Sequence, residues 1–232
     1  MASLLSIDWD YFISTGNQQI ISSIENERTI HDLWYKRYFE YESYGKHFEQ
    51  YFRLAEEVQY FWQMVRTKFQ WGPNVKVFVS DSHALSYKIA HKFKIDDVYL
   101  FDAHSDLGYG GLASLDFEVN CANWLGKLLK QRTIQSAHII YSPFTCEHPT
   151  DFDEMNRTFD IHYPTLQQLP ERIDTNVIHI CRSGAWSPPW FDTQFVQFVK
   201  DLNLPYQQYQ CDVRDWDPQH VNFSQKLQYM MS

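Results

Sequence analysis

Residues 99–107 (YLFDAHSDL) constrain the fold most, because an apolar strand runs directly into an Asp-x-His-x-Asp cluster. Alternate side chains of a strand point to the same side. We therefore expect Asp102, His104 and Asp106 to converge where the strand ends. Burying three such groups together without a cation would leave uncompensated charge, which is costly. The segment predicts a site for a divalent cation.

Two further segments place metal-type side chains after an apolar run. LLSIDWDYF (4–12) carries Asp8 and Asp10, and VKVFVSDSH (75–83) ends in His83. Each has an ordinary alternative, because Asp caps helices and histidine is often a hydrogen-bonded core residue. Together the segments supply four carboxylates and two imidazoles, enough for two ions that share ligands and activate a water molecule. Such an oxygen-rich site suits Mn²⁺, with Zn²⁺ or Fe²⁺ as poorer fits.

The chain alternates between predicted strands and predicted helices. Such alternation predicts an α/β fold with a mostly parallel sheet flanked by helices. Ligands bind at the carboxyl ends of strands in such sheets, where Asp8, His83 and Asp102 fall. The predicted strands are 3–9, 75–80, 97–102, 136–142 and 176–182, and the predicted helices are at about 17–40, 44–70, 84–93, 121–132 and 189–202.

We expect one domain over residues 1–232, because no Pro/Gly/Ser-rich linker divides the chain and its length supports one sizeable core. Residues 17–75 form an aromatic-rich helical insertion in this prediction. Aromatic residues at helical spacing favour core packing, and the alternative is a groove for an extended peptide.

The composition of the chain limits the kinds of partner and the cellular compartment that we expect. The chain has 20 Lys and Arg against 29 Asp and Glu, a net charge of −9, and no basic cluster. This disfavours nucleic-acid binding and favours a cationic partner. The apolar runs are too short to span a bilayer. Four cysteines without C-x-x-C spacing and without a signal peptide are expected to be reduced thiols, which predicts a cytoplasmic protein.

Three motifs resemble the arginase/deacetylase (ureohydrolase) superfamily. SDSHALS (80–86) is similar to its Gly-Gly-Asp-His-Ser turn, DAHSD (102–106) to its Asp-Ala-His-x-Asp strand end, and IDWD (7–10) to its Asp-x-Asp strand end. The resemblance implies a three-layer arginase-like fold with a binuclear manganese site. Asp8 and Asp102 would bridge the ions; His83 and Asp106 would complete one, and His104 and Asp10 the other. Asp106 would also hold the attacking hydroxide as a catalytic residue.

The chain departs from ordinary arginases in two ways. Its Asp-x-Asp strand opens the chain instead of following the Asp-Ala-His-x-Asp strand, so the strand order in sequence is rearranged. Where arginases carry a proton-shuttle histidine in an Asn-x-His-Gly context, this chain reads EVNCANWLGKLL (118–129).

A smaller branch of the superfamily shares the Asn-Trp element, the DWDYF segment and an Arg-Ser-x-x-Trp-x-Pro-Pro-x-Trp segment. CRSGAWSPPWFD (181–192) is similar to the last of these. Members of that branch are peptide arginases, which convert arginine side chains of ribosomally made precursor peptides to ornithine. The resemblance covers about residues 1–14 and 76–192 and implies an arginine-containing precursor peptide as partner.

A bound guanidinium needs acceptors, because its five donors require partners once desolvated. Glu147, after the strand IIYSP, is our candidate acceptor, and a surface carboxylate is the alternative. Asn120 and Asn123 stand behind it, with Glu118. Arg182 is expected to pair a site carboxylate or hold a peptide carbonyl, unless it forms a structural salt bridge.

Trp186 is our candidate for peptide contact, and His148 for the catalytic proton shuttle, with His162 and His179 as alternatives. The stretch QCDVRDWDPQH (210–220) is expected to be a solvated loop. Three functions remain open: arginase-type hydrolysis of a peptide guanidinium, deacetylase-type amide hydrolysis, and metal-stabilised peptide binding without turnover. Six ligands favour the first over the second, because deacetylases of the superfamily use one zinc with fewer ligands.

Overall fold

The computed structural model describes residues 2–16 and 27–231, and a seven-stranded sheet forms its centre. The strands of this sheet are β1 (Ser3–Asp8), β5 (Lys76–Ser80), β6 (Asp97–Asp102), β7 (Ser136–Tyr141), β8 (Ile161–His162), β10 (Val177–Cys181) and β11 (Gln207–Tyr209). Their spatial order is β11-β5-β10-β1-β6-β7-β8. Every pairing is parallel, so all the carboxyl ends meet at one edge.

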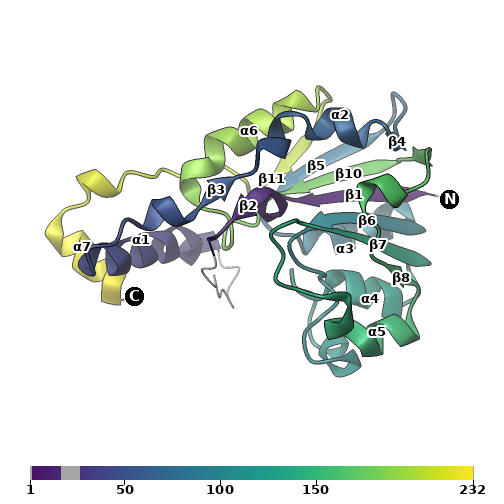
Figure 1. Cartoon of the computed structure of the whole chain (residues 1–232), viewed down its shortest axis with the longest axis horizontal. Coiled ribbons are helices and arrows are strands. Elements are labelled where there is room, and N and C mark those ends of the chain that lie inside the picture. Colours follow the sequence, from purple (N-terminus) through teal and green to yellow (C-terminus); the bar gives the residue numbers. More distant parts are fainter. Residues whose placement is uncertain (1, 17–26, 232) are drawn as a thin grey trace.

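Five of these strands were predicted within one or two residues, and the predicted parallel sheet flanked by helices is confirmed (Figure 1). The sequence did not predict β8 and β11, whose two and three residues are too short to show a period. β1 lies in the middle between β10 and β6, which places the first strand of the chain beside the Asp-x-His-x-Asp strand.

Only some of the predicted helices match helices of the structure. The helices are α1 (Glu27–Ser43), α2 (Phe61–Val65), α3 (Leu85–Phe93), α4 (Trp124–Lys130), α5 (Asp153–Thr158), α6 (Asp192–Asp201) and α7 (Phe223–Met231). α3, α4 and α6 match predictions, and α1 matches the end of the predicted helix 17–40, of which residues 17–26 lie outside the described residues. Short 3-10 helices lie at Trp9–Phe12 (η1), Phe48–Tyr51 (η2), Glu56–Gln59 (η3), Leu112–Asp116 (η4), Pro149–Phe152 (η5), Leu166–Gln168 (η6), Pro189–Phe191 (η7) and Pro218–His220 (η8).

The predicted helix at 44–70 is wrong. That stretch is divided into η2, β3 (Arg53–Leu54), η3, α2 and β4 (Phe69–Gln70). β3 pairs with β2 (Ile13–Ser14), and β4 pairs with β9 (Ile173–Asp174). Phe48, Phe52 and Phe61 are all buried although they lie on different short elements. The aromatic spacing therefore reflects several turns that each bury a ring, not one helical stripe.

The two faces of the sheet carry different layers. Leu5 and Ile7 of β1 belong to an aromatic-rich core with Trp9 and Phe198, under α2 and α6. Leu4 belongs to the opposite core, under α3 and α4. Because strand side chains alternate, Ser6 and Asp8 share the face of Leu4. The predicted metal ligand of β1, Asp8, thus lies on the α3 side of the sheet.

The aromatic insertion contributes mainly to the core. Trp34, Phe52 and Trp62 are buried, which confirms core packing for them, whereas Tyr44 and Tyr60 are exposed. α1 also packs against α7, where the rings of Tyr35 and Tyr229 stack at 4.7 Å. The two helices lie side by side at the left of Figure 1.

No helix within the described residues combines the length and the apolarity needed to cross a membrane. None of the four cysteines forms a disulfide in the structure. Residues 210–217 form the predicted loop, and only Pro218–His220 adopts a 3-10 turn there.

Candidate metal centre

All six predicted metal ligands lie together at the carboxyl edge of the sheet. Asp8 ends β1, and Asp10 follows it on η1. Asp102 ends β6, which pairs directly with β1, and His104 and Asp106 follow in the next loop. The sixth ligand is His83, in the loop after β5. Parallel strands explain the convergence, because their carboxyl ends share one edge.

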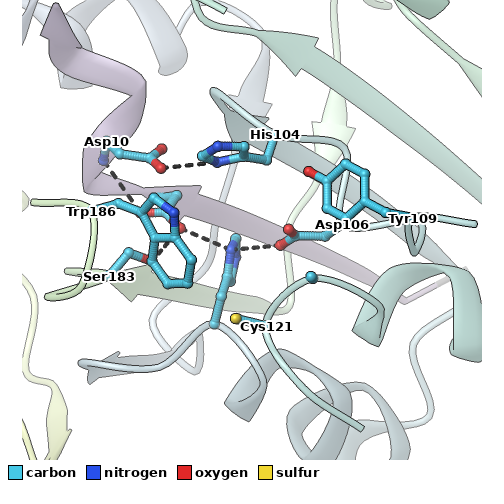
Figure 2. A pocket seen from close by; sticks show the side chains of 10 residues that line it. Asp10, His104, Asp106, Tyr109, Cys121, Ser183 and Trp186 are labelled. Carbon is cyan, nitrogen blue, oxygen red and sulfur yellow. Dashed lines mark hydrogen bonds and ion pairs between the residues drawn. The ribbon is translucent and has the colours of Figure 1, made fainter. Parts of the chain in front are cut away.

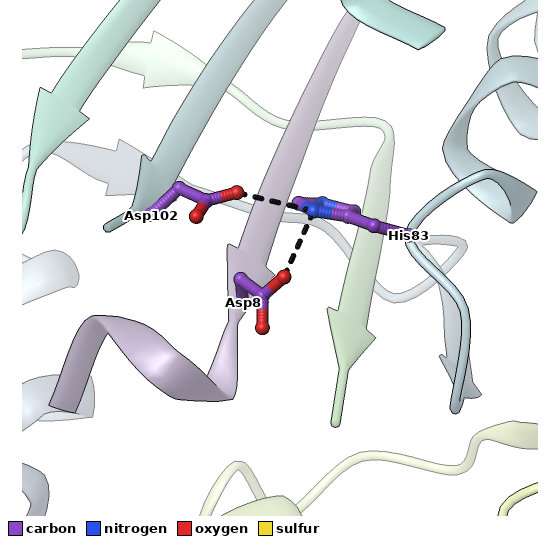
Figure 3. A group of neighbouring side chains, drawn as sticks. All are labelled: Asp8, His83 and Asp102. Carbon is purple, nitrogen blue, oxygen red and sulfur yellow. Dashed lines mark ion pairs between the residues drawn. The ribbon is translucent and has the colours of Figure 1, made fainter. Parts of the chain in front are cut away.

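His83 is the centre of the first group of ligands (Figure 3). Its Nδ1 lies 3.1 Å from Asp8 Oδ2 and 3.1 Å from Asp102 Oδ2. Asp106 Oδ2 lies 2.9 Å from the same nitrogen. Three carboxylates therefore converge on one imidazole nitrogen.

A second group consists of Asp10, Asp102 and His104. His104 Nδ1 lies 3.0 Å from Asp10 Oδ2 and 3.5 Å from Asp102 Oδ1. Asp102 thus directs one carboxylate oxygen to each group. The two groups share this residue, as expected for two ions with a common ligand.

The residues fit divalent cations by a direct test. Asp10 Oδ2, His83 Nδ1 and Asp102 Oδ2 are buried and make no hydrogen bond with any described residue. Buried polar atoms nearly always have such partners. Here these atoms face other ligand atoms of the cluster, with Asp10 Oδ2 at 3.0 Å from His104 Nδ1 and Asp102 Oδ2 at 3.1 Å from His83 Nδ1. Oxygen and imidazole donors in this arrangement suit Mn²⁺ or a similar ion.

Burial and mutual repulsion shape the protonation of the cluster. Burial, aided by Asp10, raises the pKa of Asp8 to about 6. Burial and repulsion from Asp106, Asp10 and Asp8 raise the pKa of Asp102 well above its usual value. Burial alone would lower the pKa of His83, but its carboxylate neighbours outweigh that effect and raise it.

The pKa values of His104 and Asp10, in the second group of ligands, are also shifted. Burial opposes ionisation of both His104 and Asp10, yet their attraction raises the pKa of His104 and lowers that of Asp10. The metal-free cluster therefore holds protons that bound cations would displace.

Hydrogen bonds from outside the ligand set fix its orientation. Trp124 Nε1 donates to Asp106 Oδ2, and the Ser183 hydroxyl donates to Asp8 Oδ2. Asp106 and Ser183 both adopt left-handed backbone conformations, with φ of 53° and 48°. Such strain in non-glycine residues persists only where the surroundings enforce it, and it clusters at functional sites.

A cavity of about 270 Å³ opens onto the ligands (Figure 2). Trp186 lines it, as predicted, and its ring centroid lies 6.3 Å from that of His104. Sequence reasoning missed Tyr109, Cys121, Ala122 and Ser183 in the lining. Ser183 carries a usable signal, because it follows a predicted strand just as the ligands do.

The residues predicted to bind substrate do not all line this pocket. Glu147 accepts hydrogen bonds from Ser105 N at 2.8 Å and from the Tyr109 hydroxyl. It lines a second cavity of about 220 Å³, which shares Tyr109 with the first. Glu147 is therefore close to the metal pocket but separated from it by Tyr109.

Asn120 and Asn123 hold the loop that supplies Cys121 and Ala122 to the pocket. Asn123 Oδ1 accepts from Asn120 N at 2.9 Å, and Asn123 Nδ2 donates to Glu118 O at 3.0 Å. The structure gives both asparagines contacts within their own loop, not a place in the pocket lining.

The structure does not bring the predicted proton shuttle to the pocket. His148 is exposed and caps η5, where its backbone N–H donates to Asp151. His162 is exposed beside Asp160, and His179 is fully buried. Tyr109 lines the pocket itself, whereas neither exposed histidine is among its lining residues.

Arg182 lies in a buried ion-pair network, the structural alternative considered for it. Its Nε donates to Asp81 at 2.7 Å and its Nη1 to Asp192 at 2.9 Å. Arg214 pairs with the same Asp192 at 2.6 Å and donates to the carbonyls of Gly184 and Ser187. This network holds the loop that carries Ser183 and Trp186.

Comparison of the chain with known protein families, curated proteins and solved structures gave no match.

Proposed function

We propose that this protein is a binuclear-metal hydrolase that cleaves the guanidinium of arginine side chains in a peptide, giving ornithine and urea. Two groups of ligands joined by Asp102 carry the proposal. A single-ion site would not need a carboxylate that directs one oxygen to each of two histidines. The proposed cofactors are two Mn²⁺ ions, held by the six residues predicted from the sequence.

The proposal includes an arginase-like three-layer fold with a rearranged strand order. Its support is the pairing of β1 with β6, since this pairing unites the Asp-x-Asp and Asp-x-His-x-Asp motifs although 90 or more residues separate them. A carboxyl-edge site on a parallel sheet with helices on both faces is compatible with that fold.

Bound divalent cations would lower the pKa of water enough to supply a nucleophile near neutral pH. Asp106 lines the pocket, so its carboxylate can accept a hydrogen bond from that water and direct it. Attack of the water oxygen at the guanidinium carbon Cζ and cleavage of the Cζ–Nε bond would release urea and leave Nε on the side chain as the amine of ornithine. The amine must receive a proton. Two lining residues carry a hydroxyl: that of Ser183 donates to the proposed metal ligand Asp8, whereas that of Tyr109 donates to Glu147, so Tyr109 is our candidate donor.

Peptidyl arginine suits the pocket better than free arginine does. None of the described residues that line the cavity is a lysine or an arginine. The α-carboxylate of free arginine would therefore lack a cationic partner, a contact that an amide-linked residue does not need. Trp186 and Tyr109 at the cavity offer aromatic contact area for a peptide.

The experiment measures urea release and metal content together. We expect two Mn²⁺ per chain, and faster urea release from arginine-containing peptides than from free L-arginine. One zinc per chain with cleavage of acetyl-lysine would favour a deacetylase instead. Two ions with peptide binding but no urea would indicate a binding protein without turnover.

A further inference from the structure

A chain of hydrogen bonds runs from His83 across the α3 face of the sheet, away from the pocket. His83 Nε2 lies 2.8 Å from Ser6 Oγ, and Ser6 Oγ lies 3.0 Å from Ser86 Oγ. Ser86 Oγ lies 2.6 Å from His179 Nδ1, and His179 Nε2 lies 2.9 Å from Ser80 Oγ. These side chains are almost fully buried, so none relies on solvent for a partner.

The fold explains why these residues meet. Ser6 of β1 and His179 of β10 are register partners on adjacent strands, and they point to the face covered by α3. Ser86 lies in the first turn of α3 and bridges the two. Ser80, the last residue of β5, completes the set, so these four residues belong to the packing of four elements and not to a loop.

The donor and acceptor of every hydrogen bond in this chain can be assigned by starting from its last residue, Ser80. The Ser80 hydroxyl donates to the carbonyl of Ser82 at 2.8 Å, since a carbonyl can only accept. Ser80 then has no hydrogen left, so His179 Nε2 must donate to it. His179 is fully buried, and its two ring nitrogens contact only serine hydroxyls among the described residues, so a charged imidazolium there would be uncompensated and costly; the ring is neutral and its Nδ1 accepts.

The same logic continues toward the metal centre. Ser86 gives its only hydrogen to His179 Nδ1, so the Ser6 hydroxyl must donate to Ser86. Ser6 then can only accept at its other contact, and His83 Nε2 must be the donor. With Nε2 fixed as a donor, Nδ1, which faces three carboxylate oxygens, is the nitrogen that can offer a lone pair to a cation.

We propose that His179 and the serines at 6, 80 and 86 are positioning residues that hold His83 in the tautomer needed to ligate a cation through Nδ1. A hydrogen bond at the nitrogen that does not bind the metal commonly fixes the tautomer of a ligating histidine. Here that bond is the first of a chain through four residues that ends at the backbone carbonyl of Ser82. The inference rests on the proposed metal site for its purpose, but the order of the hydrogen bonds does not depend on that site.

The test reads tautomers directly in the full chain. Nitrogen NMR of ¹⁵N-histidine protein, loaded with diamagnetic Zn²⁺ as the probe, should show both His83 and His179 protonated at Nε2 only. The His179→Gln and His83→Gln variants assign the signals. A proton on Nδ1 of His179 would reverse the chain and overturn the proposal, even if urea is produced.

A variant pair gives a second measurement. Ser86→Ala interrupts the chain without touching a ligand, and we expect Mn²⁺ affinity to fall roughly 10–100-fold in a calorimetric titration. Ser3→Ala is the matched control, because Ser3 lies on the same strand and its buried hydroxyl donates only to the Asp174 carbonyl. Equal affinities in the two variants would contradict the proposal.

Failure of the proposed function would look different. The wild-type protein would then bind no Mn²⁺ and release no urea, while His179 still carried its proton on Nε2. If Ser86→Ala does not fold, the His179 signal of the wild-type protein still decides the direction of the chain.

Discussion

Two buried clusters of charge lie at the same edge of the sheet, and they are balanced in different ways. In one, Asp81 and Asp192 pair with Arg182 and Arg214. This arginine cluster has equal numbers of carboxylates and guanidinium groups, and its guanidinium side chains are only 4% and 7% exposed. In the metal centre, four carboxylates face two imidazoles.

The difference shows which cluster needs a partner from outside the chain. Two carboxylates and two guanidinium groups cancel, so the arginine cluster is complete in itself. Four carboxylates keep an excess of negative charge even when both imidazoles are protonated. Because buried unpaired charge is costly, the metal centre is either partly protonated or filled with cations. The arginine cluster needs no further partner, whereas the metal centre is expected to cost stability until ions bind.

Removing the shared carboxylate should have the largest effect. In Asp102→Asn, both groups of ligands lose a charged oxygen, so we expect loss of both Mn²⁺ ions and of urea release to the assay background. The metal-free variant should be at least as stable as the metal-free wild type, since burial and three neighbouring carboxylates all oppose ionisation of Asp102. Metal analysis and denaturant unfolding measure both effects. Retention of two ions with normal turnover would refute the site.

The equivalent change in the arginine cluster should lower the stability of the protein and leave its metal content unchanged. Asp192→Asn leaves Arg182 and Arg214 buried with one carboxylate partner fewer, and we expect the free energy of unfolding to fall by about 3–5 kcal/mol. The folded variant should still bind two Mn²⁺. Unfolding in denaturant, followed by metal analysis of the folded fraction, separates the two clusters. Unchanged stability would show that the ion pairs contribute little.

The sequence predicts one cluster and not the other, for a physical reason. The metal ligands follow apolar strands, and the alternation of side chains along a strand makes their convergence readable. Asp192 and Arg214 lie 22 residues apart with no strand to relate them, and only the folded loop brings them together. Similarly, the spacing of aromatic residues does not reveal the turns at 44–70, because tertiary packing determines where each ring is buried.

The pH dependence of stability should also distinguish the clusters. The folded-state pKa values of Asp8, Asp102, His83 and His104 are raised, so each stabilises the metal-free protein at low pH and loses that contribution as pH rises. For Asp8 the loss runs from about pH 3.8 through about 6. Asp10 opposes the trend, because its pKa is lowered and its contribution is lost as pH falls.

We therefore expect the free energy of unfolding in EDTA to decrease by on the order of 2–3 kcal/mol between pH 5 and 8. Saturating Mn²⁺ should reverse the sign of that slope, since cations compete with protons for the same ligands. Thermal unfolding at four or five pH values measures the slope, and a metal-free protein that gains stability above pH 6 would contradict the charge argument.

The smallest predicted effect lies where the two clusters meet. Arg214 donates hydrogen bonds to the carbonyls of Gly184 and Ser187. The loop between these two residues places Trp186 in the lining of the metal pocket. If Trp186 contacts the peptide equally in the ground and transition states, Trp186→Ala should raise KM about 3–10-fold and change kcat less. Trp186→Phe, which retains an aromatic ring, serves as the control and should recover most of the affinity. A fall in kcat at constant KM would instead mean that the ring orients the ligands themselves, and would make the loop held by Arg214 part of the metal centre.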